Sequence, residues 1–160
     1  MRKRNTSLSL IVLFLTLSAL AASKPASHKA TNGGPAPDSA YMQKILDAWS
    51  TLDTTKVAPY YAQGEHTFYD IAPVKYTSWD DYAKGVVQVA ADFQTVAFTL
   101  NDDAVVHPHG DLYWGTGTVK GDILHKSGKR EMATYRWTVI WEKQNGKWVI
   151  VHDHFSAPEQ

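Results

Sequence analysis

The hydrophobic and polar positions between residues 135 and 158 alternate with a period of two. Two runs rich in aromatic and β-branched residues flank Asn145-Gly146, and both residues of this pair tolerate the positive φ angles of a tight turn. The pattern therefore predicts a long antiparallel hairpin near the C-terminal end of the chain.

The length of the loop decides which face of this hairpin carries Asp153, because a shift of one residue turns every side chain of a strand to the opposite face. A three-residue loop, Gln144 to Gly146, pairs Trp137 with Asp153, whereas a two-residue loop pairs Thr138 with Asp153. We prefer the three-residue loop because it separates apolar from polar side chains more cleanly. Its apolar face holds Tyr135, Trp137, Val139 and Trp141 opposite Val149, Val151, Asp153 and Phe155, and its other face includes Ile150, His152 and His154.

Earlier in the chain the apolar positions follow a helical period first and a strand period later. Capping side chains predict where three helices begin, at Asp38 or Ser39, at Thr54 or Thr55, and at Ser78 with Asp81. The first helix is expected to end near Asp53. A short strand is expected at 66–71, and further strands at 95–100, 104–107 and 112–123, with turns at 101–103, 108–110 and 126–128. This order predicts an α+β fold in which the helices cover one face of a curved antiparallel sheet.

The first residues have the pattern of an export signal. Residues 1–22 combine a basic start, an apolar run that is short for a membrane span, and small residues before a cleavage site near Ala21-Ala22. We expect a secreted or periplasmic protein without stable membrane insertion after cleavage; an uncleaved anchor is the alternative. Residues 23–37 are rich in Pro, Gly, Ala and Ser and predict a disordered linker before one domain at 38–158.

Composition narrows the possible partners. Lys and Arg number 16, as do Asp and Glu, so no net charge attracts the chain to nucleic acid. The chain has no cysteine, which excludes disulfides and thiol chemistry.

Two carboxylates are the candidates for acid–base chemistry. Asp153 is predicted to lie on the apolar face of the hairpin, where loss of water raises the pKa of a carboxyl group. The alternative is a purely structural Asp153, held by Tyr135, Thr138 or a backbone amide. Asp70 follows a predicted strand and precedes Ala72-Pro73, so it is either a functional group or only the cap of a turn.

The chain contains six Trp and eight Tyr. Large aromatic side chains typically form the walls of small-molecule sites, and the alternative is that they fill the interior completely. The candidate ligand-binding residues are Tyr69, Trp79, Trp114, Tyr135, Trp137, Val139, Trp141 and Phe155, of which Val139 and Phe155 rest on the resemblance described next.

The order of the elements, the segment HTFYDIAP at 66–73, the helix that begins at Trp79 and the segment RWTVIWEKQNGKWVIVHDHFSAP at 136–158 resemble one superfamily. It is the nuclear-transport-factor-like, SnoaL-like group, which includes ketosteroid isomerases, polyketide cyclases and the association domain of calcium/calmodulin-dependent kinase. The resemblance covers roughly residues 39–158. It implies a cone-shaped, cystatin-like α+β barrel around a deep apolar pocket, and dimers that form through the outer sheet face.

The resemblance also suggests roles for single residues. Asp70 matches the general base of the isomerases. The polar pocket residues of the kinase association domain fall at Val139 and Phe155, so this pocket lacks that domain's arginines. The oxyanion donors of the isomerases fall near Leu46 and near Thr138 or Val139, so the chain departs from the isomerase pattern there.

Two His-x-His pairs, His107 with His109 and His152 with His154, have a spacing that zinc sites use in strands. Pro108 predicts a turn at the first pair, and the terminal V-H-x-H recurs in the resembling family without metal. We therefore expect no metal and no cofactor.

The sequence thus predicts an exported homodimer that binds a small hydrophobic or aromatic molecule. The enzyme hypothesis is cofactor-free proton transfer, isomerisation or cyclisation, of the ketosteroid isomerase or polyketide cyclase kind, with Asp70 or Asp153 as base. The competing hypothesis is a non-catalytic binding or dimerisation module.

Overall fold

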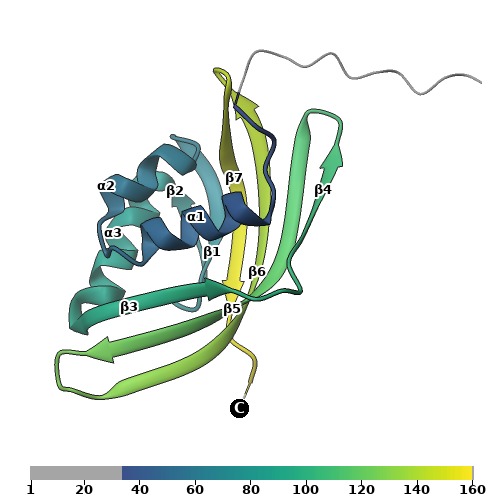
Figure 1. The fold of residues 1–160 in the computed structure, drawn as a ribbon. Coiled ribbons are helices and arrows are strands. Elements are labelled where there is room, and N and C mark those ends of the chain that lie inside the picture. The colour runs from purple at the N-terminus through teal and green to yellow at the C-terminus, as the bar shows by residue number, and fades with distance from the viewer. Residues whose placement is uncertain (1–33, 160) are drawn as a thin grey trace, which may run out of the picture. The chain divides into compact units, whose positions relative to one another are not determined.

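The computed structural model describes residues 34–159, in which three α-helices lie against the concave face of a strongly bent sheet (Figure 1). The predicted export signal and residues 23–33 of the predicted linker lie outside the described residues. The helices are α1 Ser39–Trp49, α2 Thr54–Val57 and α3 Trp79–Val89, with two 3₁₀ helices, η1 Ala58–Tyr60 and η2 Ala90–Asp92. Within residues 34–159, no helix is long and apolar enough to span a membrane.

Side-chain caps fix the starts of the helices. Asp38 Oδ1 accepts a hydrogen bond from the Tyr41 amide at 2.8 Å, and Ser78 Oγ accepts one from the Asp81 amide at 3.1 Å, which confirms two predicted caps. The cap of α2 is Asp53, so the prediction of Thr54 or Thr55 was wrong. The first helix ends at Trp49 rather than near Asp53, and Leu52 beyond it has a positive φ of 57°.

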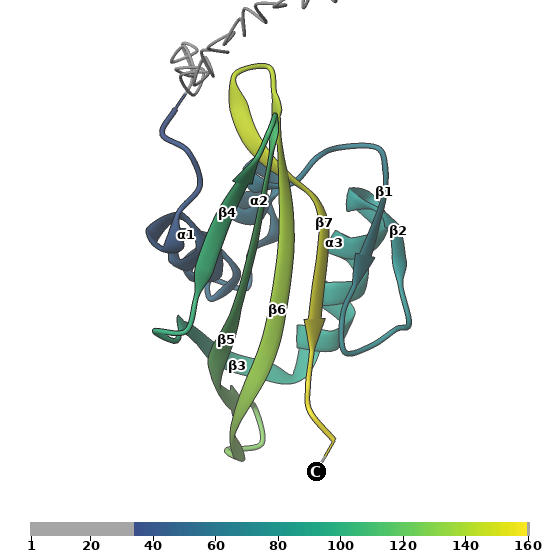
Figure 2. The same ribbon diagram turned by 90° about the vertical axis from the view of Figure 1, so that its right-hand side faces the viewer.

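The sheet has the strand order β2-β1-β7-β6-β5-β3, with β4 paired to β5 (Figure 2). Its pairs are antiparallel except the parallel pair of β1 and β7. The strands are β1 Glu65–Tyr69, β2 Tyr76–Ser78, β3 Phe93–Leu100, β4 Val105–His109, β5 Leu112–His125, β6 Arg130–Gln144 and β7 Lys147–Ser156. The predicted α+β class is confirmed, although β1 and β2 stand between the helices in the chain.

Pro108 lies within β4, paired with Tyr113, so the turn predicted at 108–110 begins later and occupies Gly110 and Asp111. In the described sheet β4 pairs only with β5. A strand with one free edge tolerates proline there, because that edge needs no backbone donor.

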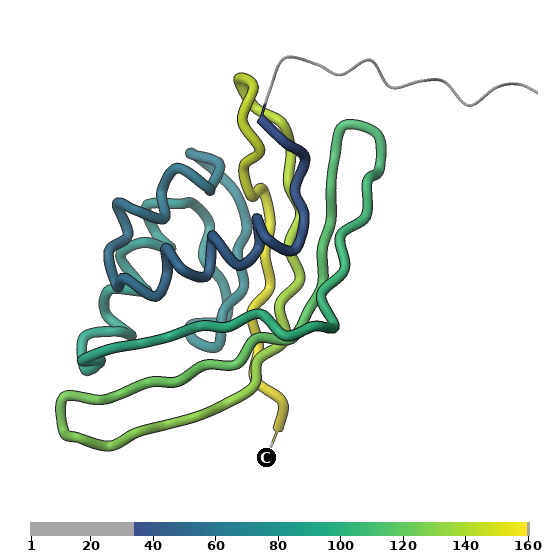
Figure 3. The backbone as a smooth tube through the Cα atoms, viewed as in Figure 1, coloured from purple at the N-terminus to yellow at the C-terminus, as the bar shows by residue number. Residues whose placement is uncertain are grey.

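The bend of the sheet lies in the long strands β5 and β6, which run from the β4 and β7 region to the β3 region (Figure 3). Glycines on the inner face of β5 let aromatic rings approach the backbone. A Cβ atom at Gly121 would lie 2.6 Å from Cε2 of Tyr135, and one at Gly115 would lie 3.0 Å from Cζ3 of Trp141. These glycines therefore make room for the aromatic side chains of β6.

The C-terminal hairpin turns at Asn145 and Gly146 alone, with φ angles of 51° and 79°, so the three-residue loop was wrong. Near the turn Trp141 pairs with Ile150, which is therefore buried on the inner face and not on the outer face as predicted. A β-bulge then shifts the register by one residue, and Asp153 pairs with Val139 instead of Trp137. The shorter loop and the bulge each shift the pairing by one residue, so together they shift it by two. Asp153 therefore still lies on the predicted apolar face.

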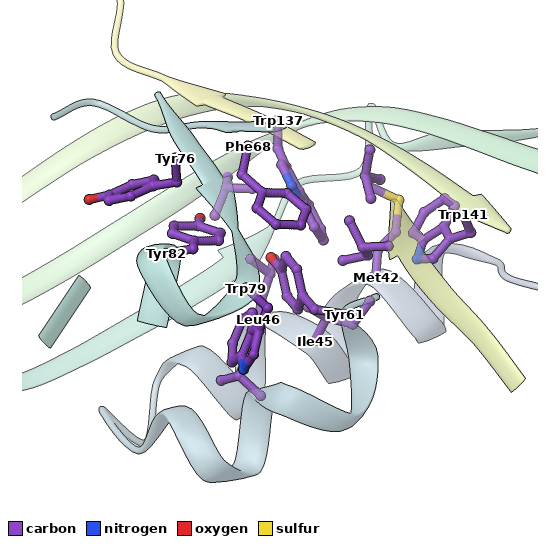
Figure 4. Packing of buried hydrophobic residues seen from close by; sticks show 14 of the residues in the cluster. Met42, Ile45, Leu46, Tyr61, Phe68, Tyr76, Trp79, Tyr82, Trp137 and Trp141 are labelled. Atoms are coloured by element: carbon purple, nitrogen blue, oxygen red, sulfur yellow. The ribbon is translucent and has the colours of Figure 1, made fainter. Parts of the chain in front are cut away.

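The core lies between the helices and the inner face of the sheet (Figure 4). The rings of Tyr61 and Trp79 pack with centroids 4.8 Å apart, and Phe68 from β1 contacts Tyr61 from the side. Met42 and Trp141 lie at the other end of the same cluster. Aromatic packing thus positions Tyr61, which has a further role in the site.

Candidate active site

A cavity of about 260 Å³ remains between the helices and the inner face of the sheet. Its walls come from α1, α3, η2 and strands β3, β5, β6 and β7, and they are mainly aliphatic and aromatic. A dry cavity of about 150 Å³ is known to bind benzene. The present cavity therefore has room for a compact molecule of about two rings.

Asp153 is the buried polar side chain of this cavity, with an exposed fraction of 1%. Strand β7 places it between Val139 of β6 and Phe68 of β1, on the inner face of the sheet. Its Oδ2 accepts a hydrogen bond from the Tyr61 hydroxyl at 2.7 Å. Its Oδ1 is buried and has no hydrogen-bond partner within residues 34–159. One carboxylate oxygen is therefore anchored, and the other has no hydrogen-bond partner.

Tyr61 is held in place from two sides. The backbone of Tyr61 forms an isolated β-bridge with Ile150 of β7. The amide of the next residue, Ala62, donates a hydrogen bond to the Ile150 carbonyl at 2.9 Å. Its hydroxyl accepts a hydrogen bond from Trp49 Nε1 of α1 at 3.1 Å. A chain of hydrogen bonds thus runs from Trp49 through Tyr61 to Asp153 and fixes the orientation of the carboxylate.

Burial raises the pKa of Asp153 to about 7, and the negative charge of Asp70 acts in the same direction. The hydrogen bond from Tyr61 and the nearby indole of Trp137 act in the opposite direction. Burial also holds the pKa of the Tyr61 hydroxyl well above its usual value, so this group stays protonated. Near neutral pH Asp153 exists in both protonation states, as a general acid or base requires.

Asp70 lies directly after β1 and borders the same cavity. Burial raises its pKa, while the Ile71 amide, which donates to Oδ1 at 2.7 Å, and Tyr82 lower it. The pKa of the Tyr82 hydroxyl is held well above its usual value by burial and then by the charges of Asp153 and Asp70. Two interacting carboxyl groups and two protonated phenols therefore share one mainly apolar cavity.

The structure brings five of the predicted site residues together. The predicted catalytic residues and three of the predicted ligand-binding residues line the cavity: Asp70, Asp153, Tyr135, Trp137 and Phe155. Their roles remain predictions, but the geometry that the hypothesis needs is present.

Five other predicted residues do not line the cavity. Trp79, Val139 and Trp141 are buried in the packed core and are not among the residues that line the cavity. Trp114 and Tyr69 are 41% and 37% exposed, because alternation along β5 and β1 turns them to the outer face. Trp114 stacks there on His107, and Tyr69 contacts the rings of His152 and His154.

Sequence reasoning missed Trp49, Tyr61 and Tyr82 as parts of the site. Each belongs to an apolar helix pattern in which a buried side chain is expected to be core, and no local signal relates them to Asp153. Tyr135 and Thr138 were considered as partners of Asp153, but the structure assigns that place to Tyr61.

The histidines of the two His-x-His pairs lie elsewhere. His152 Nδ1 lies 2.8 Å from the Thr67 carbonyl oxygen, which occupies one ring nitrogen. Among the residues that the structure describes, no group of three or more His, Cys, Asp or Glu side chains is arranged to hold a metal ion.

Comparison with solved structures shows the same fold in several proteins. A nuclear transport factor 2-like superfamily protein of Salmonella enterica is 18% identical, with 74% of this chain and 89% of that chain covered and a TM-score of 0.66. The association domain of calcium/calmodulin-dependent protein kinase II from C. elegans is 20% identical, with coverage of 74% and 92% and a TM-score of 0.59. A Streptomyces avermitilis protein named as a dehydratase of the same family is 14% identical, with coverage of 76% and 92% and a TM-score of 0.64.

The comparison with curated proteins finds no match. The family model of the SnoaL-like domain matches residues 39–160, which includes every helix and strand described above. With this match and the curved sheet that holds an apolar cavity, the chain belongs to the SnoaL-like domain family.

Proposed function

We propose that this protein binds a compact, mainly apolar molecule in the cavity and moves a proton on it without a cofactor, with Asp153 as the acid–base group. The observation that carries the proposal is the buried Asp153 carboxyl, which borders the cavity, has one oxygen without a hydrogen-bond partner and has a pKa raised to about 7. A carboxyl group kept only for structure would be expected to have both oxygens paired.

The other groups divide the remaining work. Trp49 and Tyr61 hold Oδ2 of Asp153, so that Oδ1 keeps a fixed position against the bound molecule. Asp70, which is less buried, receives the proton that Asp153 releases or supplies the one that Asp153 takes up. A neighbouring carboxyl group suits this role, because two adjacent carboxyl groups that share one proton are more stable than two adjacent carboxylates that are both charged. The resemblance to proteins named as dehydratases supports proton transfer, the step that dehydration shares with isomerisation.

Deuterium exchange tests this proposal without a known reaction product. The mature protein is purified from its own host, bound molecules are identified by native mass spectrometry, and each is then incubated with the protein in D₂O. We expect the wild type to catalyse incorporation of deuterium at a carbon atom of the bound molecule, since hydrogens on nitrogen and oxygen exchange with D₂O without a catalyst. The Asp153→Asn variant should lower the rate at least about 100-fold, the usual contribution of a general acid or base.

Asp102→Asn is the matched control, because it removes one carboxylate from an exposed turn outside the cavity. It should exchange at the wild-type rate. Exchange by Asp153→Asn at the wild-type rate, with the molecule still bound, would remove the catalytic proposal and leave the competing binding module.

We propose that the protein forms a homodimer through the outer sheet face. The support is a set of exposed apolar side chains on that face, Val105, Leu112, Trp114 and Met132, together with the fold shared with an association domain. Sedimentation equilibrium should give the mass of a dimer, and a concentration-independent monomer mass would contradict the proposal.

We also propose that the mature protein acts after export. The support is the sequence of residues 1–22, with its basic start, short apolar run and small residues. N-terminal sequencing of protein recovered outside the cytoplasm should begin close to Ser23, and recovery of the intact chain from the cytoplasm alone would refute export.

A further inference from the structure

The charge of the cavity is one-sided. Its ionisable lining includes three carboxylic acids, Asp70, Glu131 and Asp153, and no Lys, Arg or His. Glu131 faces Lys129 and His125 on the outside, whereas Asp70 and Asp153 have no cation among the residues that line the cavity. An anionic ligand would therefore meet only repulsion inside, and a cation would relieve the mutual repulsion of the two carboxylates.

The cavity also offers an unpaired hydrogen-bond acceptor. The Tyr61 hydroxyl already donates to Asp153 Oδ2 and accepts from Trp49 Nε1. Asp153 Oδ1, fully buried, has no hydrogen-bond partner among the described residues, and the nearby indole of Trp137 is the donor that lowers the pKa of this carboxyl besides Tyr61. Because an unpaired buried acceptor is unfavourable, a ligand that brings an N–H donor to this position gains more than one that brings another acceptor.

Aromatic rings also line the cavity. Tyr61, Tyr82 and Trp137 all line the cavity, and the rings of Tyr61 and Tyr82 have centroids 5.7 Å apart. The negative faces of aromatic rings attract an organic cation, and the attraction is stronger where water is excluded.

We infer that the ligand is a compact amine of about two rings, which binds as its ammonium ion between Asp153 and Asp70. This inference rests on the proposal that the cavity is the ligand site, and it names the chemical class that the site selects. The apolar walls hold the ring system, Asp153 Oδ1 accepts from the ammonium, and Asp70 supplies the second negative charge.

Four probes that share one ring skeleton test the inference by calorimetry on the full mature chain at pH 8. They are 2-aminoindane, 2-indanol, 2-indanone and indane-2-carboxylate, which differ only in the polar group. We expect 2-aminoindane to bind at least about tenfold more tightly than 2-indanone, and indane-2-carboxylate to bind least.

Variants assign the preference to the carboxylates. Asp153→Asn should remove at least tenfold of the affinity for 2-aminoindane and leave that for 2-indanone within about threefold. Asp70→Asn, at the less buried position, should reduce amine binding in the same direction even if Asp153→Asn folds poorly. The exposed control Asp102→Asn should bind all four probes as the wild type does.

The affinity of an amine and the affinity of a ketone should change with pH in opposite directions. The groups that face Asp153 are Tyr61 after η1, Tyr82 of α3 and Asp70 after β1, and the two phenols remain neutral in this range. An ammonium binds the ionised carboxylate, so its affinity should rise between pH 6 and pH 8. A ketone binds the protonated carboxyl, so its affinity should fall over the same range.

Equal or tighter binding of 2-indanone or of the carboxylate would overturn the amine assignment while leaving the cavity as the ligand site. If none of the four probes binds the wild type, the ligand site itself is refuted, and with it the proposed function.

Discussion

The stability of this protein should depend on pH through Asp153, and replacement by Asn should remove that dependence. The ordinary pKa of an Asp side chain is 3.8, and in the fold that of Asp153 is about 7, so the native state holds the proton more tightly than the unfolded state. The sign follows: this group's contribution to stability is fully present below pH 3.8 and is lost as the pH rises through 7. At about 1.4 kcal/mol per pH unit, the full loss is roughly 4 kcal/mol.

The Asn side chain has nearly the same shape, can accept the hydrogen bond from Tyr61 and cannot ionise. We therefore expect Asp153→Asn to have about the same free energy of unfolding as the wild type near pH 4.5. At pH 8.5 the variant should be more stable, by up to roughly 4 kcal/mol, because the wild type then buries a charge. The coupling of Asp153 to Asp70 makes this figure an upper bound, since loss of one charge also relieves the other.

Urea denaturation of both proteins at several pH values between 4.5 and 8.5 measures this difference, and Asp102→Asn controls for removal of a carboxylate as such. Free energies of wild type and Asp153→Asn that change in parallel with pH would refute the reasoning. The raised pKa of Asp153, and with it the acid–base proposal, would then have to be abandoned.

Three further substitutions test other parts of the structure. Tyr61→Phe removes the hydrogen bond to Asp153, so it should raise the pKa of that carboxyl further and lower the free energy of unfolding at pH 8 by about 1.5–3 kcal/mol. Carbon-detected NMR titration measures the pKa, and an unchanged titration curve would contradict the role of Tyr61. Gly85→Ala should lower the melting temperature, because the new Cβ would lie 2.2 Å from Cε1 of the buried Tyr76. This clash should outweigh the gain in helix propensity from Gly to Ala, which is about 1 kcal/mol. A higher melting temperature would show that the Tyr76 ring can move. Trp114→Asp, on the exposed outer face, should leave the melting temperature of the monomer nearly unchanged and weaken the dimer in sedimentation experiments, and an unchanged dimer would place the interface elsewhere.

The sequence was sufficient for the fold because each element carries its own local signal. Asp38 and Ser78 cap helices through contacts with residues three positions away, and the Asn145-Gly146 turn needs only two positive φ angles. The hairpin register was harder. A two-residue turn alone would place Asp153 opposite Thr138, and only the bulge between Ile140 and Trp141 turns it inward. Bulges carry little local signal, so the correct face was predicted with the wrong loop and the wrong partner.

The site could be predicted only in part, because its contacts join residues far apart in the chain. Asp153 was recognisable as a carboxylate on an apolar face, but its partner Tyr61 lies 92 positions earlier. Nothing near Tyr61 distinguishes a tyrosine that anchors a carboxylate from one that fills the core. The number of aromatic residues in the cavity wall was overestimated for the same reason. The sequence pattern shows that Trp79 and Trp141 are buried, but only the packing shows that Met42 and Gly115 leave no cavity beside Trp141.

Two features of the interior reduce stability, and they coincide in space. A cavity of about 260 Å³ remains unfilled beside a core whose other side chains pack closely, and the carboxyl group that borders it is the buried polar residue of the described chain. Either feature alone could be an accident of packing, and a larger apolar side chain would remove both. Their coincidence, with one carboxylate oxygen held by Tyr61 and the other without a hydrogen-bond partner, is what a binding site requires and what a purely structural core would lose. The stability that Asp153→Asn is expected to restore at high pH is therefore a measure of what the fold gives up for its site.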